Sequence, residues 1–156
     1  MFGDLGEEAI EVILKHQFLG QLGCHANDLT YVVPISYAYQ NNYIYAYSQE
    51  GMKIDMMRTN PKVCFEVHTL QNMANWQCVV VWGDFEEIKE EAERNEAIQI
   101  LLRRDLPSVA SEKAYLTAKR PLTPGEVKSE DVKGIVFRIK LTKKTGRYEN
   151  REVIPY

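Results

Sequence analysis

The segment TYVVPISYAYQNNYIYAYS, residues 30–48, contains two strand-like runs joined by two asparagines. Both runs are rich in β-branched and aromatic residues, which favour strands. Asn41 and Asn42 separate the runs, and asparagine tolerates the positive φ angles that a type I′ hairpin turn requires. The pattern predicts that residues 30–40 and 43–48 pair as an antiparallel hairpin.

Pro34 interrupts the first of these two runs. Because proline has no N–H group to give to a β-ladder, it is confined to sheet edges, bulges and strand starts. We therefore expect an edge, a bulge or an opening of the sheet at this point. Main-chain groups around Pro34, Ile35 and Ser36 would then be available to a ligand.

The remaining elements follow from hydrophobic periodicity and from proline and glycine. Helices are expected over residues 7–16, 51–60, 90–104 and 105–119. Strands are expected over residues 18–25, 62–70, 76–88 and 134–141, and an exposed loop over 120–134. The unbroken apolar middle of 76–88 predicts a strand buried on both faces. The order predicts a mainly β fold with short helices, a six-stranded antiparallel barrel, and not the alternation of a doubly wound sheet.

Length, charge and cysteine content indicate how many domains to expect and which binding partners to exclude. The chain has 156 residues and a net charge of -3, with 22 acidic and 19 basic residues, which suits one domain over residues 1–156 without a basic face for nucleic acid. No apolar segment approaches the ~18 residues of a membrane span. The odd number of cysteines suits reduced thiols. We expect a cytoplasmic protein that binds neither nucleic acid nor membrane.

A metal site can be argued from Cys64, Glu66 and His68, since alternate residues of a strand share a face. Side chains at that spacing start about 7 Å apart. Two of them could share a metal ion only if they converged. We therefore expect no metal site.

The segment SQEGMK, residues 48–53, lies between a predicted strand and a predicted helix. The first N–H groups of a helix are unpaired and carry the positive end of its dipole, which suits an anion. Ser48 can donate a hydrogen bond, Gly51 permits close approach of the main chain, and Lys53 supplies a charge. A phosphate site is one interpretation, and a serine helix cap beside a solvated lysine is the other.

Three longer segments carry a family resemblance. They are GQLGCHANDLTYVVPISYAY (20–39), YIYAYSQEGMKIDMMRTNPKVCFEV (43–67) and NWQCVVVWGDFEEI (75–88), followed by GIVFRIKLTKKTGR (134–147). In this order they resemble the FMN-binding split-barrel family related to pyridoxamine 5'-phosphate oxidase, in the branch similar to nitroimidazole-resistance proteins. The resemblance implies a homodimer of six-stranded split barrels with FMN bound at the subunit interface.

The resemblance also implies which residues bind the cofactor. One segment would line the flavin ring and ribityl chain: Pro34, Ile35, Ser36 and Tyr37. A second would hold the phosphate: Tyr47, Ser48, Gly51, Met52 and Lys53. The partner chain would contribute a third: Trp76, Gln77 and Cys78.

Some positions depart from the family pattern. Many relatives have arginine where this chain has Gln21, and Arg-Ser where it has Gln77 and Cys78. Two possible charges near the ligand are therefore absent, and phosphate binding would shift toward Lys53 and Arg58. Nitroimidazole-resistance members often carry histidine at the position of Met52, so reduction of nitro drugs is not expected.

The resemblance implies an FMN-dependent oxidoreductase that passes electrons from a reduced nicotinamide or another small donor to a small-molecule acceptor. No residue of the chain is marked as a catalytic acid, base or nucleophile. Tyr37, Tyr47 and Trp76 would either wall a substrate slot or fill the dimer seam. A flavin carrier or sensor without turnover is an alternative, and so is haem binding, for which His25 is the candidate axial ligand.

Overall fold

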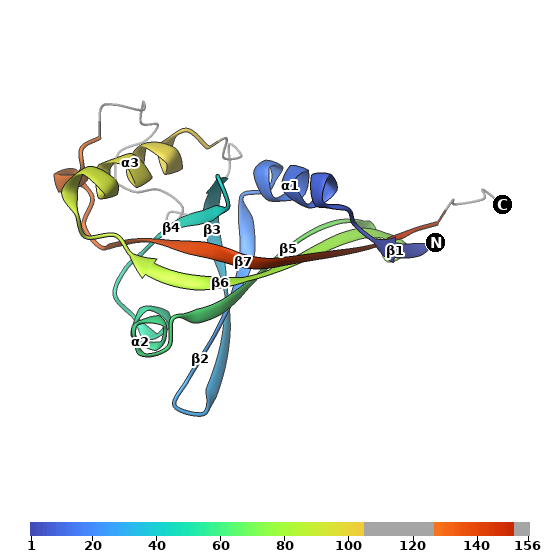
Figure 1. The fold of residues 1–156 in the computed structure, drawn as a ribbon, viewed down its shortest axis with the longest axis horizontal. Coiled ribbons are helices and arrows are strands. Elements are labelled where there is room, and N and C mark those ends of the chain that lie inside the picture. Colours follow the sequence, from blue (N-terminus) through green and yellow to red (C-terminus); the bar gives the residue numbers. More distant parts are fainter. Residues whose placement is uncertain (105–126, 152–156) are drawn as a thin grey trace.

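The computed structural model describes residues 1–104 and 127–151 and is mainly β (Figure 1). The strands are β1 (Phe2–Asp4), β2 (Leu19–Ala26), β3 (Leu29–Gln40), β4 (Tyr43–Ser48), β5 (Lys62–Asn72), β6 (Asn75–Glu87) and β7 (Ile135–Asn150). The helices are α1 (Glu7–His16), α2 (Met52–Thr59) and α3 (Glu91–Leu102), with a 3-10 turn, η2, over Ser129–Asp131. The helix predicted over 105–119 lies outside the described residues.

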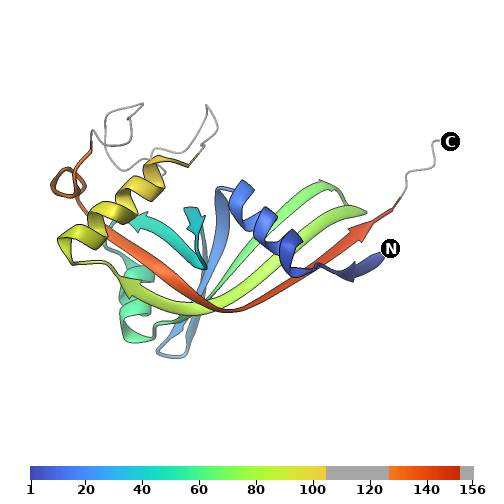
Figure 2. The same cartoon turned by 45° about the horizontal axis from the view of Figure 1, so that its top comes forward.

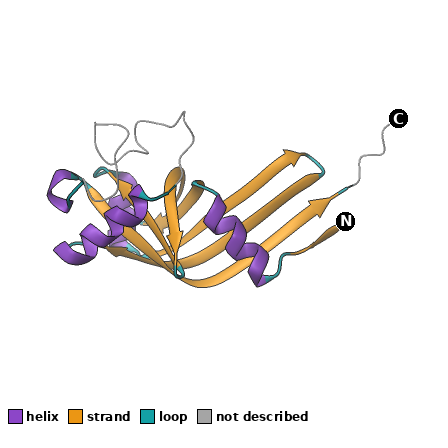
Figure 3. Cartoon of the chain, turned by 90° about the horizontal axis from the view of Figure 1, so that it is seen from above, coloured by secondary structure: helices purple, strands orange, loops and turns teal. Residues whose placement is uncertain are grey.

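Six of the strands close into a ring. The antiparallel order β7-β4-β3-β2-β5-β6 is completed by pairing of β6 with β7, which confirms the predicted six-stranded antiparallel barrel. The short strand β1 pairs with the end of β7 and was not predicted, since three residues are too few to show periodicity. Beyond the ring, β5, β6 and β7 continue as an arm, and α1 lies along it (Figures 2 and 3).

Both hairpin turns of the β2–β3–β4 meander have residues in the left-handed region. Asn41 and Asn42 have φ angles of 49° and 68°, which confirms the predicted type of turn. Asn27 and Asp28 have φ angles of 50° and 61° and form a second turn of the same kind. The dipeptide Asn-Asp has the same tolerance for positive φ as Asn-Asn.

The edge expected at Pro34 is present. Residues 29–36 of β3 pair with β2, whereas pairing with β4 begins at Tyr37. Pro34 therefore lies where the described part of β3 has a partner on one side only, and its missing N–H group costs no ladder bond. The ring is open along this half of β3.

The prediction that residues 76–88 are buried on both faces is wrong for the chain as described. Val79, Val81 and Phe85 fill the barrel, while Val80 is half-buried and Trp82 is 38% exposed. One face of an antiparallel barrel strand points outward, so an apolar run by itself does not specify two buried faces.

The loop predicted to be exposed over 120–134 is partly buried where it is described. Val127, Ser129 and Val132 are buried against α3, and Arg94 of α3 donates hydrogen bonds to the carbonyl oxygens of Ser129 and Val132. The prolines, glycines and charged residues of this segment predicted a loop, but they did not show that its valines would pack against α3. No helix among the described residues combines the length and apolarity needed to cross a membrane.

A half-buried polar network fastens α1 to the barrel. Tyr39 of β3 donates to Glu11 of α1 at 2.8 Å, and the ammonium of Lys144 of β7 donates to the same carboxylate. Burial alone would raise the pKa of Glu11, but the hydrogen bonds from Lys144 and Tyr39 outweigh it, so the pKa is lowered. The folded state therefore favours the ionised carboxylate.

Replacing this carboxylate tests the network. A Glu11→Gln variant should lose about 1–2 kcal/mol of unfolding free energy at about pH 7, the scale of a hydrogen bond to a charged group. Because the folded-state pKa of Glu11 is lowered, its contribution is present above the ordinary carboxyl pKa and is lost as the pH falls through the folded value. Urea unfolding should therefore show the difference between wild type and variant shrinking in acid. Glu8→Gln, an exposed change on the same helix, is the control, and an equal loss there would contradict the role of Glu11.

Candidate functional site

The corner where β4 meets α2 is formed by residues 48–53. Ser48 is buried, and its hydroxyl donates to the carbonyl oxygen of Gln49 at 2.8 Å instead of capping the helix. The residue at the N-cap position of α2 is Gly51, and no side chain makes a capping hydrogen bond there. The interpretation of Ser48 as a helix cap is therefore wrong.

The start of α2 is open to solvent. Gly51 is exposed, and a Cβ atom added there would meet nothing within 4 Å. Met52 is 54% exposed, whereas Lys53 is half-buried in the first turn and is not a fully solvated lysine. The corner thus combines helix N–H groups without a side-chain cap, the positive end of a helix dipole and a lysine, which suits an anion.

Arg58, expected to help bind a phosphate, already has carboxylate partners. Its two terminal nitrogens contact Glu50 at 2.9 Å and Glu87 at 2.6 Å. The hydrogen bonds from Arg58 hold the pKa of Glu87 below its usual range. Arg58 therefore joins the loop before α2 to the end of β6, and Lys53 lies in the first turn of α2.

Tyr47 is bound to the segment that precedes β7. Its hydroxyl donates to the carbonyl oxygen of Lys133 and accepts from the side chain of Gln49 at 2.7 Å. Its ring lies against Gly134, where φ is +116° and an added Cβ would come within about 3 Å of Tyr47. Tyr47 thus stabilises the floor of the corner.

The segment expected to line a flavin ring alternates between the two faces of β3. Ile35 and Tyr37 point into the barrel, where Tyr37 is 0% exposed and donates to the carbonyl oxygen of Leu14 at 2.9 Å. A side-chain role for Tyr37 as the wall of a slot is therefore wrong. Pro34 and Ser36 belong to the outer face, and the Ser36 hydroxyl oxygen is buried without a hydrogen-bond partner.

The segment expected from the partner chain begins β6, on the arm and away from α2 (Figures 1 and 2). Trp76 donates to Glu149 at 3.1 Å, and Gln77 accepts from Thr69 at 3.2 Å. Cys78 donates to Glu66 at 3.4 Å, and burial together with this carboxylate raises the pKa of the thiol to about 11. Cys78 is therefore not an activated nucleophile. A single chain does not bring this segment to the β4–α2 corner.

His25, the candidate haem ligand, lies exposed near the β2–β3 turn. Its Nδ1 atom is 3.0 Å from the hydroxyl of Thr30, which pairs with it across the hairpin. Its surroundings on the outer surface are not those of an enclosed haem pocket.

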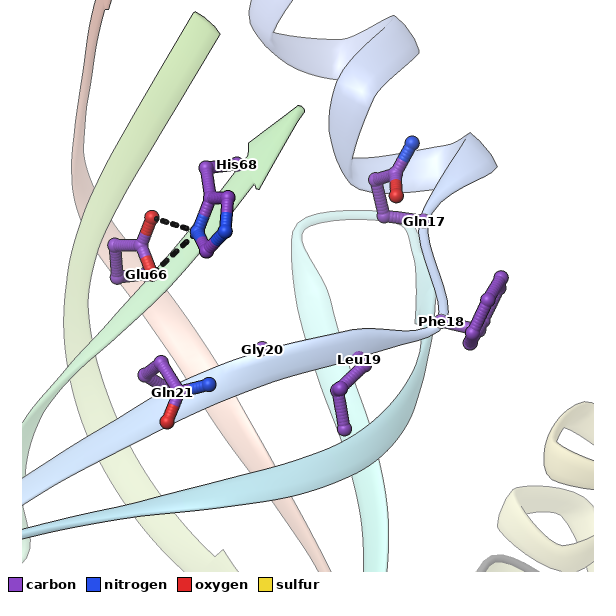
Figure 4. A pocket seen from close by; sticks show the side chains of 7 residues that line it. All are labelled: Gln17, Phe18, Leu19, Gly20, Gln21, Glu66 and His68. Atoms are coloured by element: carbon purple, nitrogen blue, oxygen red, sulfur yellow. Dashed lines mark hydrogen bonds and ion pairs between the residues drawn. The ribbon is translucent and has the colours of Figure 1, made fainter. Parts of the chain in front are cut away.

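A cavity that sequence reasoning did not find lies between the start of β2 and β5 (Figure 4). Its volume is about 190 Å³ and its lining is Gln17, Phe18, Leu19, Gly20, Gln21, Glu66 and His68. Gln21 connects the cavity to the segment expected to line the flavin ring, since Gln21 pairs with Pro34 on one side and Glu66 on the other. The available signal was the alternation of Glu66 and His68, which we interpreted only as a weak metal pattern. The described residues hold no group of three or more potential metal ligands.

Comparisons with known proteins agree with this architecture. The chain is 27% identical to an FAD-binding protein of Mesorhizobium loti, with a TM-score of 0.73 over 96% of this chain and 99% of that one. A candidate 5-nitroimidazole antibiotic resistance protein of Bacteroides thetaiotaomicron superposes with a TM-score of 0.71 at 20% identity, over 95% of this chain and 87% of that one. The latter shows a shared fold.

Sequence comparison gives one curated relative, an uncharacterized protein of Rhizobium meliloti (strain 1021), which is 41% identical over 84 residues. The match covers 54% of this chain and 56% of that protein, so it spans little more than half the length of the relative. A family model described as pyridoxamine 5'-phosphate oxidase matches residues 6–148. Because this match runs from α1 into β7, the chain belongs to the pyridoxamine 5'-phosphate oxidase family.

Proposed function

We propose that the protein binds a flavin, specifically FMN, with the flavin phosphate at the β4–α2 corner. The observation that carries the proposal is the open start of α2, where Gly51 leaves space, no side chain caps the helix, and Lys53 lies in the first turn. A phosphate dianion would satisfy the helix N–H groups and gain a charge-assisted hydrogen bond from Lys53. The FAD-binding protein of Mesorhizobium loti, which has a similar fold, supports a flavin as the ligand.

The outer side of β3 fits the rest of such a ligand. The stretch of β3 around Pro34, which is paired on one side only, offers main-chain groups that a heterocycle with hydrogen-bonding edges could satisfy. The buried, unpartnered hydroxyl of Ser36 lies in the same stretch. A bound flavin supplies the redox chemistry itself. The side chains described here would bind and orient it, and the protonated thiol of Cys78 would take no covalent part.

With a flavin bound, we propose an oxidoreductase that takes electrons from a reduced nicotinamide or another small donor and passes them to a small-molecule acceptor. Such electron transfer with turnover would distinguish an enzyme from a flavin carrier. It rests on the open outer face of β3, which would leave the flavin ring accessible to a small molecule.

We further propose that two chains associate through the outer face of the barrel. Val32, Gly23, Cys64 and Trp82 are directly opposed in register across four strands, so their side chains share this face. Val32 is 61% exposed and Trp82 is 38% exposed. An apolar row of this kind beside Pro34 and Gln21 suits a second copy that encloses the flavin and supplies residues from its own arm.

The visible spectrum of the purified protein tests flavin binding. Bands of oxidised flavin, retained or acquired on addition of FMN, are expected, and chromatography of the released cofactor distinguishes FMN from FAD. A protein that stays colourless after incubation with either flavin would overturn the proposal. Anaerobic bleaching by NADH or NADPH separates turnover from carriage.

Lys53→Ala tests the phosphate site. Because a charge-assisted hydrogen bond would be removed, the affinity for FMN should fall by about 1.5–3 kcal/mol, measured by fluorescence titration. Lys62→Ala is the matched control, since Lys62 lies beyond the other end of α2 and pairs with Asp84 at 2.5 Å. Equal affinity of the Lys53 variant and wild type would remove this residue from the site.

Val32→Lys tests the proposed interface. A charge in the apolar row should weaken dimerisation at least about tenfold in sedimentation experiments and reduce flavin uptake in parallel. Val12→Lys is the control, because Val12 is a similarly exposed valine, 50% against 61%, that lies on α1. A Val32 variant that remains dimeric and binds flavin as well as wild type does would contradict the proposed interface.

A further inference from the structure

Glu66 and His68 form a pair on the outer face of β5. The Nδ1 atom of His68 is 2.9 Å from one carboxylate oxygen of Glu66 and 3.2 Å from the other. The thiol of Cys78, directly opposite His68 on β6, donates to the same carboxylate at 3.4 Å. His68 and Cys78 therefore hold Glu66 in place beside the cavity, and Figure 4 shows the contact with His68.

This pairing determines what His68 presents to the cavity. A carboxylate accepts hydrogen bonds and donates none, so the hydrogen shared with Glu66 belongs to Nδ1. The Nε2 atom lies on the far side of the ring from Glu66 (Figure 4). In the neutral ring Nε2 is an acceptor, and its natural ligand partner is an N–H or O–H group.

The cavity is small, and its lining contains one carboxylate and no lysine or arginine. About 190 Å³ is below the usual range of sites for drug-sized ligands, roughly 300–1,000 Å³, and suits a single ring with one substituent. None of its lining residues is lysine or arginine, and Glu66 supplies a negative charge. The side-chain amides of Gln17 and Gln21 can donate and accept. An anionic ligand would meet the carboxylate without a cation to offset it.

The cavity is adjacent to the proposed flavin ring. Pro34, Gln21 and Glu66 lie in one row across β3, β2 and β5. With strands about 4.8 Å apart, Glu66 lies about 10 Å from Pro34. A ligand in the cavity would therefore be within reach of a flavin held along β3.

We infer that this cavity is the binding site for an uncharged, ring-sized ligand with an N–H or O–H donor, that His68 accepts this hydrogen bond, and that Glu66 excludes anionic analogues. The identification of this ligand as the substrate rests on the proposed function. A phosphorylated or carboxylate substrate would not suit this cavity.

Nicotinamide and nicotinate are matched probes, because they share one ring and differ in an uncharged amide against a carboxylate. Each is titrated into isotope-labelled protein at about pH 8, above the range in which histidine ordinarily titrates, and the ring signals of His68 are followed by NMR. These signals are assigned with a His68→Gln variant. Nicotinamide should shift them and bind at least about tenfold more tightly than nicotinate.

Glu66→Gln should lower this preference without abolishing it, because the amide carries no charge while nicotinate still lacks the N–H donor that His68 accepts. Glu91→Gln on α3 removes an exposed carboxylate elsewhere and should leave the preference unchanged. Equal affinity for the two probes in wild type, or His68 signals that neither probe moves, would overturn the inference.

The titration is run on flavin-free and flavin-saturated protein so that the two proposals fail separately. Protein that takes up no flavin but binds nicotinamide at His68 would overturn the proposed function and support the cavity as a ligand site. Protein that takes up flavin, but whose His68 ring signals do not shift with either probe, would overturn the inference and leave the proposed function standing.

Discussion

The pairing of β7 with both β4 and β6 is the constraint on which the rest of the structure depends. It closes the ring, so each of the six barrel strands has a neighbour on both sides over part of its length. The first half of β3, which β4 does not reach, is paired on one side only. This stretch includes Pro34 and Ser36, and it is where a ligand is proposed.

The inside–outside alternation of the barrel strands then assigns the chemistry. Tyr37 and Phe65 point inward and pack edge to face, with ring centres 5.1 Å apart. Their immediate neighbours Ser36 and Glu66 point outward. The Ser36 hydroxyl has no hydrogen-bond partner, and Glu66 is hydrogen-bonded to His68. Polar groups that would be costly in the core therefore gather on one external face. The cavity and the β3 edge are two parts of that face.

Two cationic side chains of α2, Lys53 and Arg58, lie at different positions along the helix. Arg58 is engaged by two carboxylates, and its contacts connect α2 to the end of β6. The helix start has Lys53 in its first turn and no side-chain cap on its N–H groups. The helix dipole favours Arg58 in the last turn of α2 and an anion at its first turn. The Arg58 ion pairs also reach Glu50, the residue before Gly51.

The sequence by itself determined the hairpin over 30–48, the helices over 7–16 and 51–60, and the family, because these depend on local periodicity, turn residues and motif order. It did not reveal β1, the burial of Val127 and Val132, or the exposed side of β6, each of which depends on partners distant in the chain. Only the tertiary structure decided that Tyr37 is a core residue, that Arg58 is paired with two carboxylates, and that Glu66 and His68 border a cavity with Gln21, the residue paired with Pro34. Contacts between strands far apart in sequence create these relations, and no local pattern encodes which strands become neighbours.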